Sequence, residues 1–237
     1  MTRTAPLRRV GHKGADLIAP GNTPASFDAA LEAGVDMIEF DVLPLDPGAP
    51  ETTPLLLAHD HAHALDEAMT LARGLDHLAS EPFGTTELDV DLKFPGYEER
   101  VVRALQERGL VDRAIVSSQW MRSLAKVRSL EPGLRLGWSV PKVRRDYSSR
   151  LWAPVVLVAL GLYRRRLPAA AAGHLAAGRI DAVMTYDPLV TARLVQMVHG
   201  AGGEIYAWTI DKAERIRELE AMGVDAVITN DPRLFES

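Results

Sequence analysis

The sequence contains no cysteine, which excludes disulfides, a thiolate nucleophile and any zinc site built from cysteine ligands. It also has no excess of basic residues: 27 Lys and Arg against 32 Asp and Glu give a formal net charge of −5. This balance argues against a nucleic-acid-binding protein, for which a basic surface is expected. The basic residues near the start of the chain are not followed by an apolar run of signal-peptide length. We therefore expect a cytoplasmic protein.

What the sequence does have is an alternation of apolar, strand-like runs with helical patterns along all 237 residues. About eight strands alternate with helices, as expected for a closed parallel barrel of roughly 250 residues. We therefore predict an α/β protein, a TIM (β/α)8 barrel with a single domain over 1–237. The predicted strands lie at 10–11, 37–42, 55–58, 88–94, 114–118, 134–139, 182–184, 205–208 and 226–229, and the predicted helices at 24–33, 65–78, 98–108, 121–130, 188–199 and 212–222.

A doubly wound open sheet has the same alternation and is the alternative fold. Against it, no G-x-G-x-x-G follows the first strand, and no P-loop glycine–lysine motif occurs in the sequence. The barrel also predicts polar residues at the carboxyl ends of its strands, where barrel active sites are built. The sequence has such residues late in its predicted strands or just after them: His12, Glu39, Asp41, His59, Asp91, Lys93, Ser117, Ser118, Trp138 and Trp208.

Two of the predicted strands carry acidic residues on one face. In the strand 37–42 a period of two separates Glu39 and Asp41 from the apolar residues, and the strand 88–94 has the same layout for Asp89 and Asp91. Unpaired buried carboxylates cost several kcal/mol each, so such groups usually have a cation between them. A half-exposed strand with a solvated polar face is the alternative for either stretch alone. Together, the two strands indicate opposing walls of a metal site.

The types of residue at these strand ends suggest a chemistry. Carboxylates without cysteine indicate a hard cation with oxygen ligands, Mg²⁺ or Ca²⁺ rather than zinc. Two histidines near the same rim suit a general acid and a general base. With lysines nearby, a cation and two histidines make a receptor for a phosphate diester, because the positive charges stabilise the non-bridging oxygens.

The same residues occur in motifs that resemble those of the glycerophosphodiester phosphodiesterases. That family has a His-Arg-Gly start, Pro-Glu-Asn-Thr, a Glu-x-Asp-Val strand, a His-Asp pair, a Glu-x-Lys strand, a late Trp-Thr and a Gly-Val-Asp strand that ends near a proline. The resemblance covers residues 10 to about 94 and 204 to 232. Its matching stretches are His12-Lys13-Gly14, Pro20-Gly21-Asn22-Thr23, Ser26-Phe27, Glu39-Phe40-Asp41-Val42, His59-Asp60, Asp91-Leu92-Lys93, Trp208-Thr209 and the run from Gly223 to Pro232.

The resemblance implies a TIM barrel that hydrolyses glycerophosphodiesters to glycerol 3-phosphate and an alcohol with a divalent metal. Carried over by position, the metal ligands would be Glu39, Asp41 and Asp91. The acid/base pair would be His12 and His59, in either order. The substrate contacts would be Lys13 and Lys93 for the phosphate and Trp208 for the pocket wall.

Three departures from the family pattern leave alternatives open. Lys13 replaces an arginine and loses its two-pronged contact with phosphate oxygens. Gly21 replaces a glutamate, so one expected carboxylate is missing, and Asp91 replaces a glutamate that is one methylene longer. Asp89 on the same strand face could compensate for the shorter reach of Asp91. A barrel that binds phospholipid without catalysis is therefore one alternative function.

A second alternative rests on the stretch 144–168. Within it, the 13 residues 151–163 carry no charge, and arginines flank them on both sides. This run is too short to cross a bilayer, which needs about 20 apolar residues. It predicts a core helix, a lid over the barrel mouth, or an interfacial segment whose arginines meet lipid phosphates. The last of these implies peripheral membrane contact and a lysophospholipase D-like activity on lysophospholipids.

Overall fold

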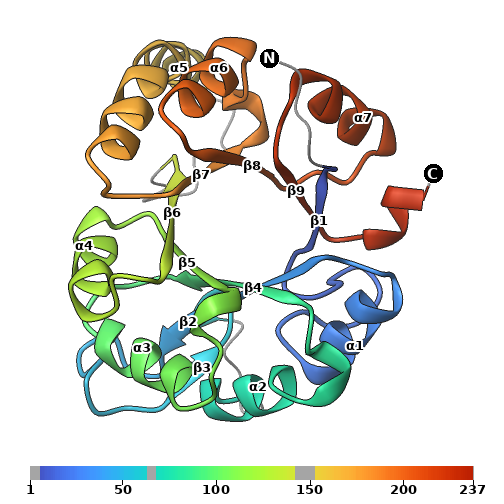
Figure 1. Cartoon of the computed structure of the whole chain (residues 1–237), viewed down its shortest axis with the longest axis vertical. Coiled ribbons are helices and arrows are strands. Elements are labelled where there is room, and N and C mark those ends of the chain that lie inside the picture. The colour runs from blue at the N-terminus through green and yellow to red at the C-terminus, as the bar shows by residue number, and fades with distance from the viewer. Residues whose placement is uncertain (1–5, 63–67, 142–152, 237) are drawn as a thin grey trace.

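Eight parallel strands close into a barrel in the computed structural model, which describes residues 6–62, 68–141 and 153–236, with side chains from residue 161 in the last range (Figure 1). Strand order follows the sequence, and pairing of the first with the second strand closes the ring. The predicted TIM barrel is thereby confirmed over the open sheet. The barrel strands are β1 (Arg8–Gly11), β2 (Met37–Pro44), β4 (Glu87–Leu92), β5 (Ala114–Ser118), β6 (Arg135–Val140), β7 (Ala182–Tyr186), β8 (Glu204–Trp208) and β9 (Ala226–Thr229).

The segment predicted as a strand at 55–58 does form a strand, but it is not one of the eight barrel strands. This segment, β3 (Leu55–Leu57), pairs antiparallel with the end of β2. The connection from β2 holds turns and no helix in the described part, and parallel neighbours need a crossover of a dozen or more residues. The short connection therefore returns the chain alongside β2, and β3 pairs with Val42–Pro44 at the carboxyl end of that strand.

The described helices pack around the outside of the barrel (Figure 1). Two predicted boundaries are wrong: the helix expected at 65–78 begins at Leu71 after the capping residue Thr70, and the one expected at 188–199 begins after Thr191. In both cases a threonine side chain accepts from a first-turn N–H and fixes the start. The helices are α1 (Pro24–Glu32), α2 (Leu71–Leu78), α3 (Glu98–Gln106), α4 (Met121–Leu130), α5 (Ala153–Ala176), α6 (Ala192–Gly200) and α7 (Ala213–Met222).

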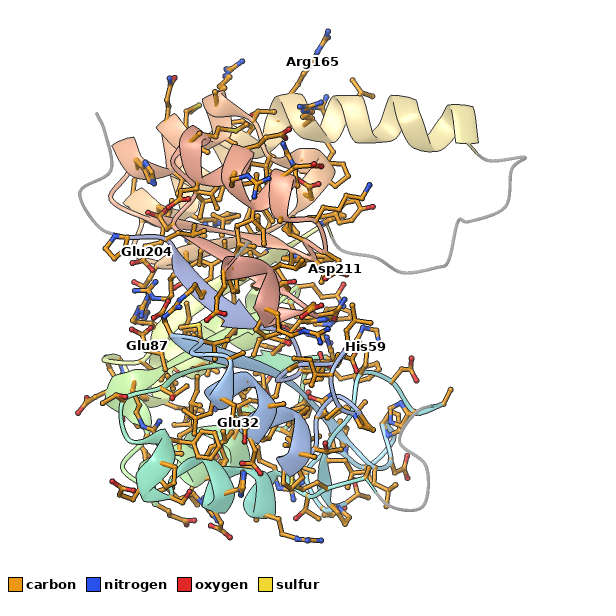
Figure 2. The ribbon with its side chains drawn as sticks, turned by 90° about the vertical axis from the view of Figure 1, so that its right-hand side faces the viewer. Glu32, His59, Glu87, Arg165, Glu204 and Asp211 are labelled. Atoms are coloured by element: carbon orange, nitrogen blue, oxygen red, sulfur yellow. The ribbon has the colours of Figure 1, made fainter. Side chains whose placement is uncertain are left out.

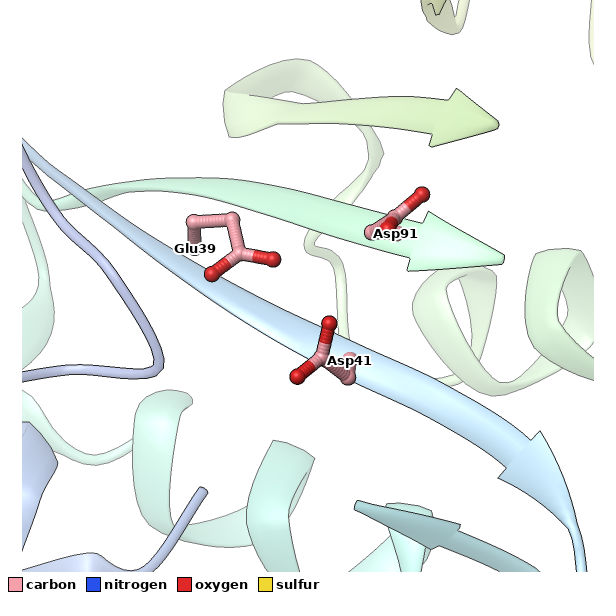
Figure 3. Close-up of side chains that lie close together, drawn as sticks. All are labelled: Glu39, Asp41 and Asp91. Carbon is pink, nitrogen blue, oxygen red and sulfur yellow. The ribbon is translucent and has the colours of Figure 1, made fainter. Parts of the chain in front are cut away.

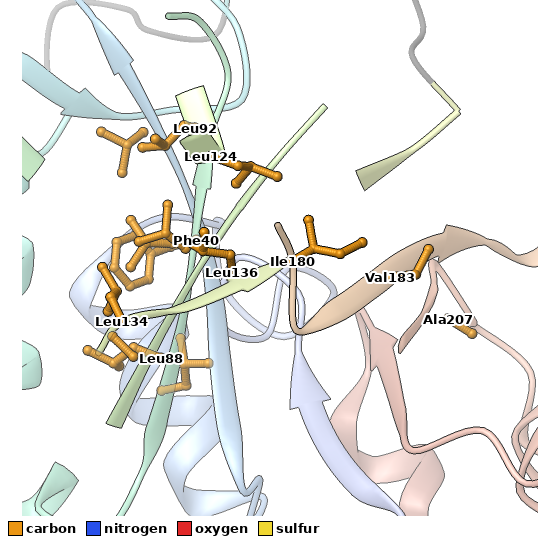
Figure 4. Packing of buried hydrophobic residues seen from close by; sticks show 14 of the residues in the cluster. Phe40, Leu88, Leu92, Leu124, Leu134, Leu136, Ile180, Val183 and Ala207 are labelled. Carbon is orange, nitrogen blue, oxygen red and sulfur yellow. The ribbon is translucent and has the colours of Figure 1, made fainter. Parts of the chain in front are cut away.

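The hydrophobic core lies between the barrel wall and these helices. Alternate residues of β2 and β4, such as Phe40, Leu88 and Leu92, face outward and are fully buried under the helices (Figure 4). The intervening residues of the same strands face the barrel interior, because side chains alternate along a strand. The outward apolar residues therefore fix the register that aims Glu39 and Asp41 into the barrel.

The last turns of helix α5 pack against the barrel, and its first turns project from the molecule. Leu167, Ala171 and Leu175 are buried against the barrel, whereas Leu162 is 51% exposed. The first turns of α5 extend beyond the rest of the molecule on the side where His59 lies (Figure 2). Residues 144–152 of the predicted membrane segment lie outside the described residues, as do the side chains of 153–160. No helix among the described residues is long and apolar enough to cross a bilayer.

Candidate active site

A cavity of about 820 Å³ opens at the carboxyl end of the barrel. Its wall combines carboxylates, two histidines and a lysine with apolar residues from the later strands. Asp41 is fully buried just beneath this surface. The lining residues are His12, Glu39, His59, Asp89, Asp91, Lys93, Phe94, Ser117, Gln119, Trp120, Ser139, Pro141, Met184, Trp208, Thr209 and Ile228.

Three carboxylates converge at the bottom of the cavity. Glu39 and Asp41 come from β2 and Asp91 from β4, where Asp91 is the register partner of Asp41. One oxygen from each lies within 4.8 Å of the others, and Figure 3 shows the three groups facing one another across the two strands. Asp91 therefore reaches the cluster despite its shorter side chain. Clustered carboxylate oxygens of this kind are the donor set that a hard divalent cation takes.

Two backbone turns before α1 hold these carboxylates in place. The Lys13 N–H donates to Glu39 Oε2 at 2.9 Å. The amide of Asn22 donates to Asp41 Oδ2 at 3.0 Å and accepts from the Asp41 N–H at 3.1 Å. Asn22 was missed as a site residue on sequence, although it lies inside the quoted Pro20–Thr23 motif. Its short amide both donates to the Asp41 carboxylate and accepts from the Asp41 N–H, which fixes the turn against β2.

Burial and charge act in opposite directions on the three carboxylates. Burial, and then the charge of Asp41, raise the pKa of Glu39 well above its ordinary value. Burial, the largest single effect, pushes the pKa of Asp41 upward, but the Lys93 ammonium, His12 and His59 together outweigh burial and hold that pKa below its ordinary value. The ammonium contacts Asp41 and lies 2.6 Å from Asp91 Oδ2. Lys93 thus contributes one positive charge to the cluster of three carboxylates.

His12 has a defined orientation at the end of β1. Its Nδ1 lies 2.5 Å from Asn230 Oδ1, and the Asn230 amide in turn donates to Asp211 Oδ2 at 2.7 Å. Because the Asn230 amide nitrogen donates to Asp211, the Asn230 Oδ1 is the acceptor for His12. The proton of His12 therefore sits on Nδ1, and the Nε2 lone pair is available. His12 Nε2 lies 3.8 Å from Glu39 Oε2. Burial lowers the pKa of His12, which favours the neutral, basic imidazole.

His59 is held more loosely on the opposite wall. Its side chain is 54% exposed, and its Nδ1 lies 3.4 Å from Asp60 Oδ2. The imidazole also lines a second cavity of about 840 Å³, bounded by the turns before α1 and by the segment around β3. Lys13 lines this second cavity, and its ammonium pairs with Asp16. Lys13 therefore faces the far side of His59 from the carboxylate cluster.

Trp208 forms part of the apolar wall of the first cavity. It ends β8 and stacks at a tilt on Tyr186, with ring centroids 5.4 Å apart. Phe94 and Trp120 continue this wall beside Lys93, and neither was predicted from the sequence. Both lie in loops after barrel strands, a position that marks the site region but does not say which loop side chains turn inward.

Comparison with known proteins agrees with this arrangement. Residues 56–234 match the model of the glycerophosphoryl diester phosphodiesterase family. The chain belongs to this family. The predicted enzyme class, phosphoric diester hydrolase, is thereby confirmed. A glycerophosphodiester phosphodiesterase from Caldanaerobacter subterraneus subsp. tengcongensis is 25% identical over 94% of this chain and 93% of its own length.

Solved structures show the same fold at low sequence identity. A glycerophosphodiester phosphodiesterase from Agrobacterium tumefaciens superposes with a TM-score of 0.71 at 19% identity, covering 97% of this chain and 99% of that one. A phosphodiesterase from Oleispira antarctica, solved in complex with the product sn-glycerol-3-phosphate, superposes with a TM-score of 0.69 at 19% identity, covering 98% of this chain and 97% of that one. Both structures match nearly the whole chain, including the residues before 56 that the family model does not cover.

Proposed function

We propose that this enzyme hydrolyses glycerophosphodiesters to glycerol 3-phosphate and an alcohol, with a divalent metal held by Glu39, Asp41 and Asp91. The observation that carries the proposal is the convergence of three carboxylate oxygens within 4.8 Å beside a cavity that His12 and His59 both line. The product named for the Oleispira antarctica relative supports the same substrate class. When bound, Mg²⁺ or Ca²⁺ would polarise the phosphoryl oxygens and stabilise the charge that develops on them.

The two histidines divide the proton transfers. His12 takes the proton from the attacking glycerol hydroxyl or water through Nε2, a role that its buried, neutral imidazole favours. Attack by water gives glycerol 3-phosphate directly, whereas attack by the hydroxyl gives a cyclic phosphate that a water molecule then opens to glycerol 3-phosphate. His59 gives a proton to the oxygen of the departing alcohol as the phosphorus–oxygen bond breaks, and its exposed position lets it recover that proton from water. Lys93 meets the phosphate oxygens, and Trp208 packs against the glycerol side of the diester. Lys13, which the family resemblance also makes a phosphate contact, lines the second cavity beyond His59 with its ammonium on Asp16.

A coupled assay for glycerol 3-phosphate release from glycerophosphocholine tests the proposal. We expect release with added Mg²⁺ or Ca²⁺ and none in excess EDTA, and separate titrations of the two ions identify the metal. H12A and H59A should each lower kcat by roughly 10²–10⁴-fold, because each removes a proton-transfer group. The control is H199Q, which changes a histidine on the outer helix α6 that pairs with Asp225 at 2.8 Å. Full rates in both H12A and H59A would disprove the assignment.

Lysophospholipids are a second candidate substrate class. The projection of α5 on the side of His59 supports this candidate, because its first turns carry an uncharged sequence and are followed by the exposed Arg164, Arg165 and Arg166 (Figure 2). An apolar helix with a basic end suits contact with an anionic lipid surface. Activity on lysophosphatidylcholine but not on glycerophosphocholine would favour this class. Release from neither substrate would leave a non-catalytic barrel.

A further inference from the structure

Two residues with left-handed backbone conformations hold the proposed metal ligands. Lys13 has φ of 51° and Asn22 has φ of 61°, a region that side chains other than glycine rarely adopt. Lys13 contacts Glu39 through its N–H, and Asn22 contacts Asp41 through its amide. Such conformations are unfavourable and persist only where neighbouring contacts enforce them. A group that ties the two turns together is therefore required.

Asp16 is that group. Its Oδ2 lies 3.0 Å from the Lys13 ammonium, and its Oδ1 accepts the Gly21 N–H at 2.9 Å. The Asn22 N–H also donates to the Lys13 carbonyl at 2.9 Å, which brings the two turns together. One carboxylate thus bridges Lys13, which contacts Glu39, and Gly21, the residue before Asn22, which contacts Asp41.

The absence of a side chain at Gly21 makes this bridge possible. A Cβ at position 21 would lie 2.5 Å from Asp16 Oδ1 and 2.8 Å from Lys13 Cβ, too close for either neighbour to stay in place. The Asp16 carboxylate therefore fills the space that a side chain at position 21 would take. This is the position where the family pattern has glutamate, so the carboxylate that Gly21 lacks is supplied from five residues earlier.

We propose that Asp16 is a positioning residue whose carboxylate replaces one from position 21, holding the Lys13 side chain and so fixing the turns that orient Glu39 and Asp41. The inference rests on the proposed function. It explains two departures from the family pattern as one change, because the lysine, the glycine and the aspartate are in mutual contact.

Four variants test this inference: D16A, G21E, D16A/G21E, and D28N as a matched control. Asp28 pairs with His77 at 2.8 Å outside the barrel, so D28N removes an aspartate charge away from the site. The measurements are kcat and KM for glycerophosphocholine, the metal concentration for half-maximal rate, metal affinity by calorimetry, and Tm. D16A should lower kcat/KM by roughly tenfold or more and weaken metal binding, since small misplacements of reacting groups are costly.

G21E alone should be at least as impaired as D16A, because its side chain meets the Asp16 carboxylate. The double variant D16A/G21E should recover part of the loss seen in D16A, since it restores one carboxylate to the same place once Lys13, whose Cβ lies 2.8 Å from a Cβ at position 21, has shifted. A double variant no better than D16A would overturn the replacement. A D16A variant that loses only Tm, with kcat/KM and metal affinity unchanged, would overturn the positioning role. If the wild type releases no glycerol 3-phosphate, the proposed function fails. Equal metal affinity in wild type and D16A then overturns the inference separately.

Discussion

At the scale of single residues, the inner face of the barrel holds a fourth carboxyl group that differs from the other three. Asp89 pairs in register with Glu39 but is not part of the cluster of three, and it is 1% exposed. Its Oδ1 has no hydrogen-bond partner among the described residues. Burial raises the pKa of Asp89 to about 7, and the neighbouring Asp91 adds to the rise. Asp89 is therefore a group whose ionisation opposes folding.

This pKa predicts a stability difference that depends on pH. The folded protein keeps the Asp89 proton up to about pH 7, whereas the unfolded chain loses it near the ordinary value of 3.8, so the stability contribution falls as pH rises between the two. The D89N variant lacks this ionisation. In EDTA it should be more stable than wild type at pH 8, on the order of 4 kcal/mol, and equal to wild type near pH 3.

Urea unfolding of both proteins at a series of pH values in EDTA measures this difference. The control is D112N, which changes an exposed aspartate before β5 and should give a constant offset at every pH. A D89N profile that runs parallel to wild type from pH 3 to pH 8 would show that Asp89 ionises normally in the folded protein.

The alternation of side chains along a strand is what made the acidic cluster predictable. Outward apolar residues fix which face is buried, so Glu39, Asp41 and Asp91 had to share the other face. The contacts that the ends of long flexible side chains make could not be predicted from this alternation. The Lys93 ammonium bends back to the carboxylates and that of Lys13 turns to Asp16, and several rotatable bonds separate each from its backbone. Asn22 and Asn230 were inside quoted motifs, but only the folded turns show what their amides contact.

At the scale of elements, helix boundaries and strand partners were predicted where local signals set them. Helix α4 begins and ends where the sequence predicts, and α1 starts at the predicted residue 24, directly after the capping residue Thr23. The partner of β3 was not predictable from its own apolar run, because strand direction depends on the length of the preceding connection. A core helix was one of the three structures predicted for 144–168, but the continuation of α5 to Ala176 was not predicted, since Pro168 in its interior is a residue that usually ends or kinks a helix.

Helix α5 yields a prediction about lipid surfaces. We expect the wild type to float with vesicles that contain anionic lipid and not with neutral ones, because each arginine near an anionic surface contributes about 1 kcal/mol. The triple variant R164S/R165S/R166S should lose most of this binding. Flotation at low ionic strength, with the bound fraction measured for each vesicle type, checks the expectation.

The matched control removes the same charge from elsewhere on the surface. R103S/R179S/R193S changes three exposed arginines outside the projecting turns, so its net charge equals that of the first triple variant. Equal flotation of the two triple variants would attribute binding to overall charge. No flotation of the wild type with anionic vesicles would remove the lipid-surface hypothesis altogether.

At the scale of the whole molecule, the two ends of the barrel carry different charged layers. Arg8, Glu87, Arg135 and Glu204 are each the first residue of their strands, and these strands alternate around the barrel. The interior of such a barrel is filled by layers of side chains, and each layer comes from alternate strands. Here the layer at the amino end is ionic, with both arginines contacting both glutamates and the Tyr206 hydroxyl donating to Glu204 at 3.0 Å. Glu87 and Glu204 lie at the opposite end from His59 (Figure 2).

This separation predicts that the ionic layer affects stability without affecting catalysis. E204Q leaves Arg8 and Arg135 with one carboxylate between them, and unfolding free energy should fall by about 1–3 kcal/mol because charged hydrogen bonds are lost. The value of kcat/KM should stay within about twofold of wild type, since active sites of barrels lie at the carboxyl end. The control E218Q removes an exposed partner of Arg215 and should change neither quantity measurably. A loss of kcat/KM in E204Q at temperatures where it remains folded would show that the amino end of the barrel contributes to catalysis.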